Sequence, residues 1–167
     1  MKTNEITARC ELFEEPSLEF GSNRLHLCPK RGITLFGPSS LDIYNRHPES
    51  IRIGFVGSGE TIDSALRWIE SCSIGVTGDD YNYPFPGFKA DRGFYSELSF
   101  DVDINEKLTV RELEFLSKPR MKKKERFEHT VDLVNDKLRL LAQKDRPPDY
   151  IVLALPDLLV KKSGRVD

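Results

Sequence analysis

The sequence predicts an α/β fold: a Rossmann-like, partly parallel sheet flanked by helices, with an extended N-terminal arm. Residues 51–56 form a short apolar run rich in β-branched residues, and a glycine-bearing turn and a helical pattern follow it directly. Residues 150–155 form a second continuous apolar run. Strands that are apolar on both faces and alternate with helices are typical of covered parallel sheets. We therefore expect the two runs in one sheet, with the long amphipathic helix that separates them in sequence packed against it.

The first fifty residues are expected to form the extended arm. Residues 1–15 are polar and acidic and suit either a loose arm or an edge strand. Leu18 and Phe20 alternate with polar residues, which predicts a short strand. Two proline and glycine turn signals within residues 28–39 favour extended chain that wraps a core, rather than a helix.

Residues 57–70 carry the change from strand to helix. Ser58 is a suitable N-cap, and Glu60 puts a negative charge in the first helical turn. Apolar residues then recur at helical spacing, at Ile62, Ala65, Leu66 and Ile69. Trp68 lies one position off this stripe and is expected at the edge of the core or in an interface. A strand that feeds a helix through such a turn is half of a βαβ unit, and residues 150–155 supply the other half.

The stretch between this helix and the second apolar run contains a loop, a strand and two helices. Residues 72–89 include a Pro-aromatic-Pro-Gly sequence, which predicts a packed surface loop whose aromatic part, 83–88, covers a core edge or forms an interface. Residues 94–102 predict a strand, and residues 108–116 predict a short helix. Residues 120–143 predict the longest helix, with one apolar stripe. That stripe consists of Phe127, Val131, Val134, Leu138 and Leu141.

We divide the chain into the N-terminal arm (1–50), an α/β domain (51–160) and a final segment (161–167) that starts an element without finishing it. With 167 residues, the chain is long enough for one domain with a hydrophobic core. The net charge of −2 gives no general attraction to nucleic acid, so any contact of that kind must use a local patch.

Cellular location is expected to be cytoplasmic. No apolar run approaches the length of a membrane span, and the N-terminus lacks the apolar core of a signal peptide. The cysteines are odd in number and have no metal-like spacing, which favours reduced thiols. They are Cys10, Cys28 and Cys72.

The most basic segment covers residues 118–126, where six of nine residues are cationic. It stands at the start of the predicted long helix, where positive charge opposes the macrodipole and therefore does not stabilise the helix. One interpretation is a solvated helix end. The other is a contact with a nucleic-acid backbone or with an acidic partner. The candidate contact residues are Arg120, Lys122, Lys123, Lys124 and Arg126.

A second candidate site is the turn from Gly54 to Glu60. Amide groups exposed at a helix N-terminus can hold phosphate, so the turn suits a small nucleotide- or metabolite-binding domain. However, the glycine spacing differs from the dinucleotide fingerprint, there is no P-loop lysine, and Glu60 would stand beside the phosphate. The simpler interpretation is that the glycines let strand, turn and helix pack closely.

No catalytic arrangement is found in the sequence. The histidines, His26, His47 and His129, are scattered, and we expect surface or capping roles for them. Asp79 and Asp80 lie in a loop, where carboxylates usually cap turns. No serine or cysteine nucleophile has an arguable base, and no residues have metal-ligand spacing. We therefore predict a non-catalytic protein with no cofactor and no metal.

Several short sequences, taken together and in order, resemble the N-terminal part of short prokaryotic Argonaute (Piwi-like) proteins. They are Glu15-Pro-Ser-Leu-Glu-Phe-Gly21, Arg31-Gly-Ile-Thr-Leu-Phe-Gly-Pro38, Ile51-Arg-Ile-Gly-Phe-Val-Gly57, Pro84-Phe-Pro-Gly-Phe88 and Asp149-Tyr-Ile-Val-Leu-Ala-Leu-Pro156. Their order and spacing carry the resemblance, which runs across most of the chain.

The resemblance implies a MID–PIWI protein of prokaryotic defence that holds a guide RNA or DNA strand and recognises a complementary target. Short members of this family lack the N and PAZ regions. They act beside a partner that carries an APAZ region and an effector, such as a TIR or sirtuin-like NADase. The chain would then be the non-catalytic N-terminal, MID-like lobe, with no membrane association.

This sequence departs from the family pattern at its end. In the family, the Leu-Pro strand opens the half of MID that binds the guide's 5′-phosphate, and PIWI follows. The chain ends at Asp167, soon after Leu155 and Pro156, so no residue here is assigned to that pocket, and the acidic PIWI tetrad is absent. The expectation is a truncated chain, one part of a split protein, or a first lobe kept for another purpose, including a scaffold that binds only protein.

Overall fold

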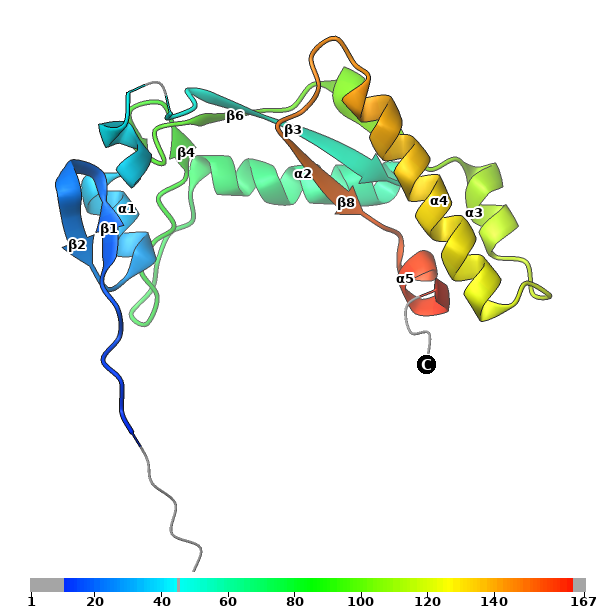
Figure 1. Cartoon of the computed structure of the whole chain (residues 1–167), viewed down its shortest axis with the longest axis horizontal. Helices are drawn as coiled ribbons and strands as arrows, with labels where there is room; N and C mark the ends of the chain where they lie inside the picture. The colour runs from blue at the N-terminus through cyan, green and yellow to red at the C-terminus, as the bar shows by residue number, and fades with distance from the viewer. Residues whose placement is uncertain (1–10, 45, 164–167) are drawn as a thin grey trace, which may run out of the picture.

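The central sheet is built on one strand, β3 (Ser50–Gly57). The computed structural model describes residues 11–44 and 46–163. Strand β8 (Tyr150–Ala154) pairs with β3 in parallel, with Ile53 opposite Tyr150 and Gly57 opposite Ala154 (Figure 1). The prediction that these two apolar runs are parallel neighbours in one sheet is confirmed.

The other edge of β3 is covered by two short strands in tandem. Strand β6 (Glu97–Ser99) pairs in parallel with the start of β3, and strand β7 (Asn105–Lys107) pairs in parallel with its end. A 3-10 turn, η3 (Val102–Ile104), separates them. The strand expected at 94–102 is therefore shorter than predicted. Strand β7 was not predicted, because its residues are polar. One of its contacts with β3 is also made by a side chain, since the Phe55 N–H donates to Asn105 Oδ1 at 3.1 Å.

Helix α2 (Gly59–Ile74) packs on one face of the sheet. Ser58 Oγ accepts a hydrogen bond from the Thr61 N–H at 3.3 Å, which confirms Ser58 as the N-cap. Ile62 and Ile69 are buried against Ile53 and Phe55 of β3. The helical stripe read from the sequence thus faces the core, and Trp68, one position off it, remains 69% exposed.

Two further helices follow β7. Helix α3 (Val110–Leu116) begins with a capping box in which Thr109 and Glu112 satisfy each other's backbone N–H groups. Helix α4 (Lys123–Ala142) contacts β3 and β7, as expected for the long helix. After β8, helix α5 (Asp157–Ser163) packs on α4. A second core cluster joins these parts through Leu108, Leu116 and Leu159.

The N-terminal part departs from the predicted extended arm. Strands β1 (Leu18–Phe20) and β2 (Arg24–His26) form an antiparallel pair around η1 (Gly21–Asn23), and helix α1 (Pro29–Phe36) leads into η2 (Ser39–Asp42). Residues 11–17 have no regular structure. The arm or edge strand expected at residues 1–15 lies largely outside the described residues.

The extended conformation predicted for residues 28–39 is wrong. Proline is favourable at the first position of a helix, and Pro29 occupies that position in α1. Gly37 then ends the helix with a φ of 70°, a conformation that glycine adopts without strain. The two turn signals are therefore the start and stop signals of one short helix.

The loop after α2 carries a small aromatic cluster. Strands β4 (Phe88–Lys89) and β5 (Arg92–Gly93) form a short antiparallel hairpin. The rings of Phe88 and Phe94 stack with centroids 4.3 Å apart, and Phe85 lies within 6.2 Å of Phe88. Because β4 contacts α2, the aromatic residues cover an edge of the core, as predicted.

Strand β8 is less buried than its sequence predicts. Tyr150 is 65% and Leu153 is 47% exposed, because β8 lies at the edge of the described sheet. The continuous apolar run therefore predicted the position of the strand correctly. The expectation that both faces of the strand are buried was wrong. None of the described helices is both long and apolar enough to cross a membrane.

Candidate nucleic-acid interface

The basic segment forms the connection between α3 and α4 and the first turn of α4. In Figure 1 this connection lies at the opposite end of the molecule from β1 and β2. Helix α4 begins at residue 123, three residues later than the sequence predicts. Residues 118–122 form a turn rather than helix.

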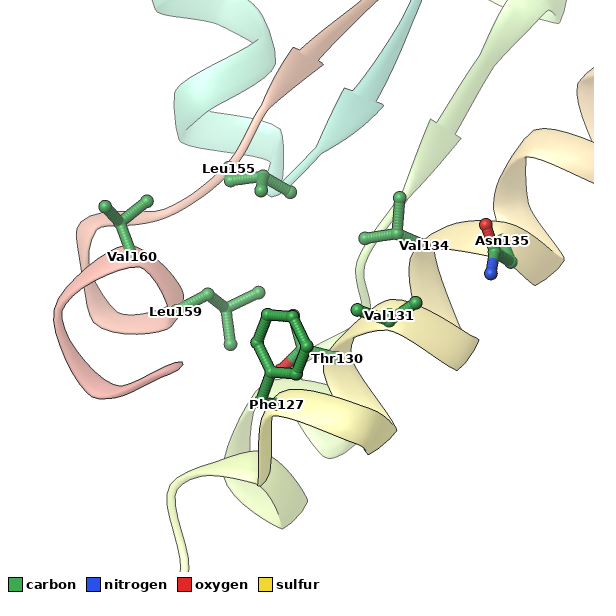
Figure 2. Close-up of a pocket in the computed structure, with 8 residues that line it drawn as sticks. All are labelled: Phe127, Thr130, Val131, Val134, Asn135, Leu155, Leu159 and Val160. Carbon is green, nitrogen blue, oxygen red and sulfur yellow. The ribbon is translucent and has the colours of Figure 1, made fainter. Parts of the chain in front are cut away.

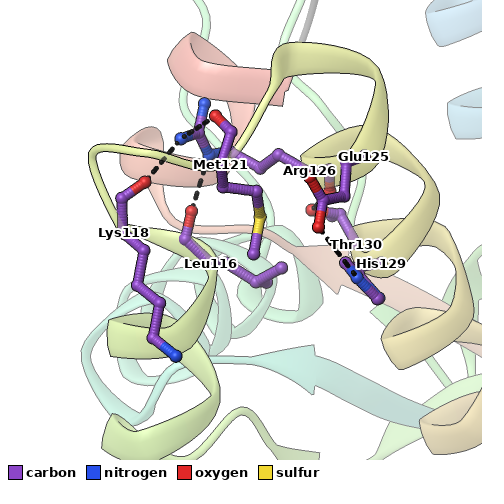
Figure 3. A network of polar contacts seen from close by, with 7 residues as sticks. All are labelled: Leu116, Lys118, Met121, Glu125, Arg126, His129 and Thr130. Atoms are coloured by element: carbon purple, nitrogen blue, oxygen red, sulfur yellow. Dashed lines mark hydrogen bonds and ion pairs between the residues drawn. The ribbon is translucent and has the colours of Figure 1, made fainter.

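Arg126 has an intramolecular role. Its Nε donates to the carbonyl oxygen of Leu116 at 2.7 Å, and its Nη2 donates to the carbonyl oxygens of Lys118 and Met121 at 3.0 and 3.1 Å (Figure 3). These carbonyl groups lie at the end of α3 and in the turn that follows, where helical partners are missing. The guanidinium group of Arg126 therefore holds the basic turn in shape through its Nε and Nη2 donors.

Two other cations of the segment also have partners. Lys124 Nζ lies 3.8 Å from Glu128 Oε1, and both side chains are well exposed. Lys118 Nζ lies over the ring of Phe115, 4.6 Å from its centroid. Exposed pairs of this kind contribute little to stability and exchange easily with other partners. The local charge is also reduced by Glu125, which lies 4.0 Å from His129 Nε2.

The remaining three cations are directed to solvent. Arg120, Lys122 and Lys123 are exposed, and within the described part of the chain no hydrogen bond or ion pair of their side chains is recorded. Lys122 is the N-cap of α4 and makes no capping bond through its side chain. The first N–H groups of α4 thus lack the side-chain acceptor that Ser58 provides to α2, and positive side chains surround them. This arrangement suits a phosphate group.

The glycine turn at the start of α2 is explained by packing. A Cβ atom at Gly57 would overlap the carbonyl oxygen of Ala154 in β8, and one at Gly54 would overlap the carbonyl oxygen of Ile104. The hydroxyl group of Thr61 also bonds the Ala154 carbonyl oxygen. The turn therefore joins β3, α2 and β8 closely, and Ser58 already caps the helix. None of these contacts favours a nucleotide.

A hydrogen-bonded cluster around His47 was not predicted from the sequence. His47 Nε2 lies 2.7 Å from the carbonyl oxygen of Tyr95, and its Nδ1 lies 2.9 Å from Ser40 Oγ. Ser96, which is 2% exposed, donates its hydroxyl group to the Pro48 carbonyl oxygen at 2.6 Å. The residues come from distant parts of the sequence, so no local pattern signals them. They fasten η2 to the turn before β6.

An apolar groove between α4 and α5 was also not predicted. Its walls are seen in Figure 2, where Phe127 and Val131 of α4 face Leu155, Leu159 and Val160. Phe127 is 43% and Val131 is 40% exposed. The stripe on α4 is therefore buried only toward its C-terminal end, where Leu141 has no exposed surface.

Potential metal ligands and the predicted turn-capping carboxylate Asp79 were also compared with the structure. Within residues 11–44 and 46–163, no three potential metal-ligating side chains come together. Asp79 accepts hydrogen bonds from the Tyr81 and Asn82 N–H groups at 2.8 Å, so it caps a turn as predicted. Those bonds, that of Tyr81 first, hold the pKa of Asp79 below its usual value.

Comparisons with known proteins provide no family for this chain. Models of known protein families were searched and none matches, and no curated protein sequence matches either.

Proposed function

We propose that this chain is the non-catalytic N-terminal, MID-like lobe of a short Argonaute-like protein in prokaryotic defence. In this proposal it supports the binding of a guide and its target and the association of an effector partner, in the cytoplasm. The proposal includes a Rossmann-like arrangement of the sheet and an N-terminal arm. It is supported by the ordered sequence resemblance, two members of which carry β3 and β8, neighbours in the sheet.

The observation that carries nucleic-acid binding is the set of three exposed cations at the start of α4. Arg120, Lys122 and Lys123 have no recorded side-chain partner within the described residues, and the helix end beside them has no side-chain cap. A phosphate group placed there meets backbone N–H donors and positive side chains at once. Contacts of this type are independent of base sequence, because they involve only the backbone of the nucleic acid.

The strength of such binding depends on salt in a predictable way. Each phosphate that the protein neutralises releases condensed counterions, so the affinity for a single strand falls with a log–log slope of about −0.7 per contact. Three contacts at Arg120, Lys122 and Lys123 would contribute a slope of roughly −2. We expect Lys124 to add a smaller share, because it is already paired with Glu128.

The test is fluorescence anisotropy with short single-stranded DNA and RNA across a series of salt concentrations. The triple variant Arg120→Glu, Lys122→Glu and Lys123→Glu should weaken binding and flatten the salt slope. A matched control changes three exposed cations elsewhere to Glu, namely Arg24, Arg92 and Lys107. If the two triple variants lose the same affinity, only net charge is acting and the site is elsewhere.

The partner part of the proposal is an effector subunit that carries an APAZ region, with a TIR or sirtuin-like domain. The exposed apolar groove between α4 and α5 supports a protein contact. Size-exclusion chromatography of the two proteins, with and without guide oligonucleotide, tests the association. A complex that forms without nucleic acid, and that forms equally well with the basic triple variant, would favour a scaffold that binds only protein.

A further inference from the structure

The turn that carries the basic segment is held at both ends by one side chain, that of Arg126. Its Nη2 donates to the carbonyl oxygen of Lys118 at 3.0 Å and to that of Met121 at 3.1 Å (Figure 3). The Met121 N–H also donates to the Lys118 carbonyl oxygen, at 3.2 Å. The guanidinium group therefore binds both ends of the turn 118–121, and Arg120 lies between the two points of attachment.

The same guanidinium group attaches the turn to the hydrophobic core. Its Nε donates to the carbonyl oxygen of Leu116 at 2.7 Å. Leu116 is 2% exposed and belongs to the buried cluster that also contains Leu108 and Leu159. Protein cores are closely packed, so a buried side chain of this kind has little freedom to move. The position of the basic turn is thereby fixed relative to the rest of the protein.

An arginine is suited to this role because its donors lie in one rigid plane. The guanidinium fork is always charged, and charge-assisted hydrogen bonds are stronger than neutral ones. A lysine carries its donors on one nitrogen atom at the end of a flexible stem. It therefore cannot span the carbonyl groups that Nε and Nη2 of Arg126 reach from two positions.

We propose that Arg126 is a positioning residue for nucleic-acid binding, an inference that rests on the proposed function of the basic segment. By ordering the turn, Arg126 holds Arg120 and Lys122 in place before a phosphate group arrives. Binding to an ordered site loses less conformational entropy than binding to a mobile one, so the affinity is higher for the same contacts. Arg126 therefore raises the affinity without adding a phosphate contact of its own.

The salt dependence of binding separates a positioning residue from a contact residue. The log–log slope reports the number of phosphates that the protein neutralises. Arg120→Gln removes a contact, so it should flatten the slope for a single strand by about 0.7. Arg126→Gln should raise the dissociation constant by roughly tenfold, because the turn must then be ordered on binding. The slope should remain that of the wild type, since the number of phosphate contacts is the same.

A charge-conserving substitution separates geometry from charge. Arg126→Lys keeps the positive charge and loses the planar fork, so it should still raise the dissociation constant by about threefold or more. The matched control is Arg139→Lys, at an arginine of the same helix that is 75% exposed and lies 3.3 Å from Asp136 Oδ1. This control should leave the dissociation constant unchanged.

Hydrogen exchange of the free protein measures the order of the turn without nucleic acid. The Met121 amide group should exchange faster in both Arg126 variants, because its hydrogen bond closes the turn. Affinity is measured by fluorescence anisotropy with short single-stranded DNA. The temperature is one at which circular dichroism shows every variant to be folded, so that a loss of stability is not counted as a loss of affinity.

The possible outcomes distinguish this inference from the proposal on which it rests. Arg126 variants that bind as tightly as the wild type, or in which exchange at Met121 is unchanged, would overturn the positioning role. So would a flattened slope in Arg126→Gln, because Arg126 would then be a contact residue. If the basic triple variant loses affinity and the Arg126 variants do not, only the positioning role falls. A wild-type chain that binds no oligonucleotide overturns the proposed function, and the positioning role with it.

Discussion

The guanidinium group of Arg126 donates a hydrogen bond to the carbonyl oxygen of Leu116, across ten residues and at 2.7 Å. It thereby ties the first turn of α4 to the last turn of α3. We expect Arg126→Gln to lower the free energy of unfolding by about 2 kcal/mol, because charge-assisted hydrogen bonds to three carbonyl groups are lost.

Urea denaturation measures this loss. Arg120→Gln is the matched control, because Arg120 is exposed and should change stability by less than about 0.5 kcal/mol. Equal losses in both variants would show that the bonds of Arg126 do not hold the turn.

Glu112 links the start of α3 to α4. Its carboxylate accepts a hydrogen bond from the Thr109 N–H at 2.6 Å and lies 3.1 Å from Lys137 Nζ. Partial burial acts to raise the pKa of Glu112, but the Thr109 and Lys137 contacts outweigh it, so the pKa lies below its usual value. We expect Glu112→Gln to cost about 1 kcal/mol at neutral pH, the usual contribution of a helix cap.

The sign of the pH dependence follows from that lowered pKa. The stabilisation is complete above the pKa of Glu112 in the unfolded chain and is lost as the pH falls through the lower pKa of the folded protein. The gap in unfolding free energy between wild type and Glu112→Gln should therefore close in acid. A gap that stays constant down to the acid range would contradict the lowered pKa.

Gly57 and Gly59 should respond differently to alanine. A Cβ at Gly57 would overlap the Ala154 carbonyl oxygen, so Gly57→Ala should destabilise the fold by about 1–3 kcal/mol, as overpacking does. A Cβ at Gly59 meets no atom within 4 Å, so Gly59→Ala should be neutral or slightly stabilising. Thermal unfolding, repeated with added nucleotides, measures both. A nucleotide that stabilises wild type, but neither variant, would revive nucleotide binding at this turn.

His47 fastens η2 to the turn before β6 through Ser40 and the Tyr95 carbonyl oxygen. We expect His47→Ala to cost about 2 kcal/mol, because it removes two hydrogen bonds and leaves partly buried partners unpaired. His26→Ala is the control, since His26 accepts only the Cys28 N–H. Hydrogen exchange should localise the loss to residues near Ser40 and Tyr95. Uniform loss of protection would point to a global effect instead.

The sequence alone predicted the frame of the fold, because its signals there are local. The apolar runs of β3 and β8, the cap at Ser58 and the stripe of α2 are each contained within a few residues, and all were placed correctly. It failed for α1, where Pro29 and Gly37 were taken as turn signals. Those residue types favour both turns and helix ends, and only the intervening hydrogen bonds distinguish the two.

The sequence located the basic segment, and its role as a site stays a prediction. The sequence alone could not separate Arg126, which bonds the chain itself, from Arg120, Lys122 and Lys123, which face solvent. Charge is a property of the residue, whereas the availability of a charge depends on which carbonyl groups lie near it.

The amino-acid order by itself determined that two apolar strands and two amphipathic helices form, since each periodic pattern favours one conformation. Tertiary structure alone decided that β8 lies at an edge of the described sheet and that His47 meets Ser40 and Tyr95. It also decided that the apolar stripe of α4 is exposed at Phe127 and Val131 and buried at Leu141. These features depend on contacts between segments far apart in the chain, and a local pattern carries no information about which segment will lie beside it.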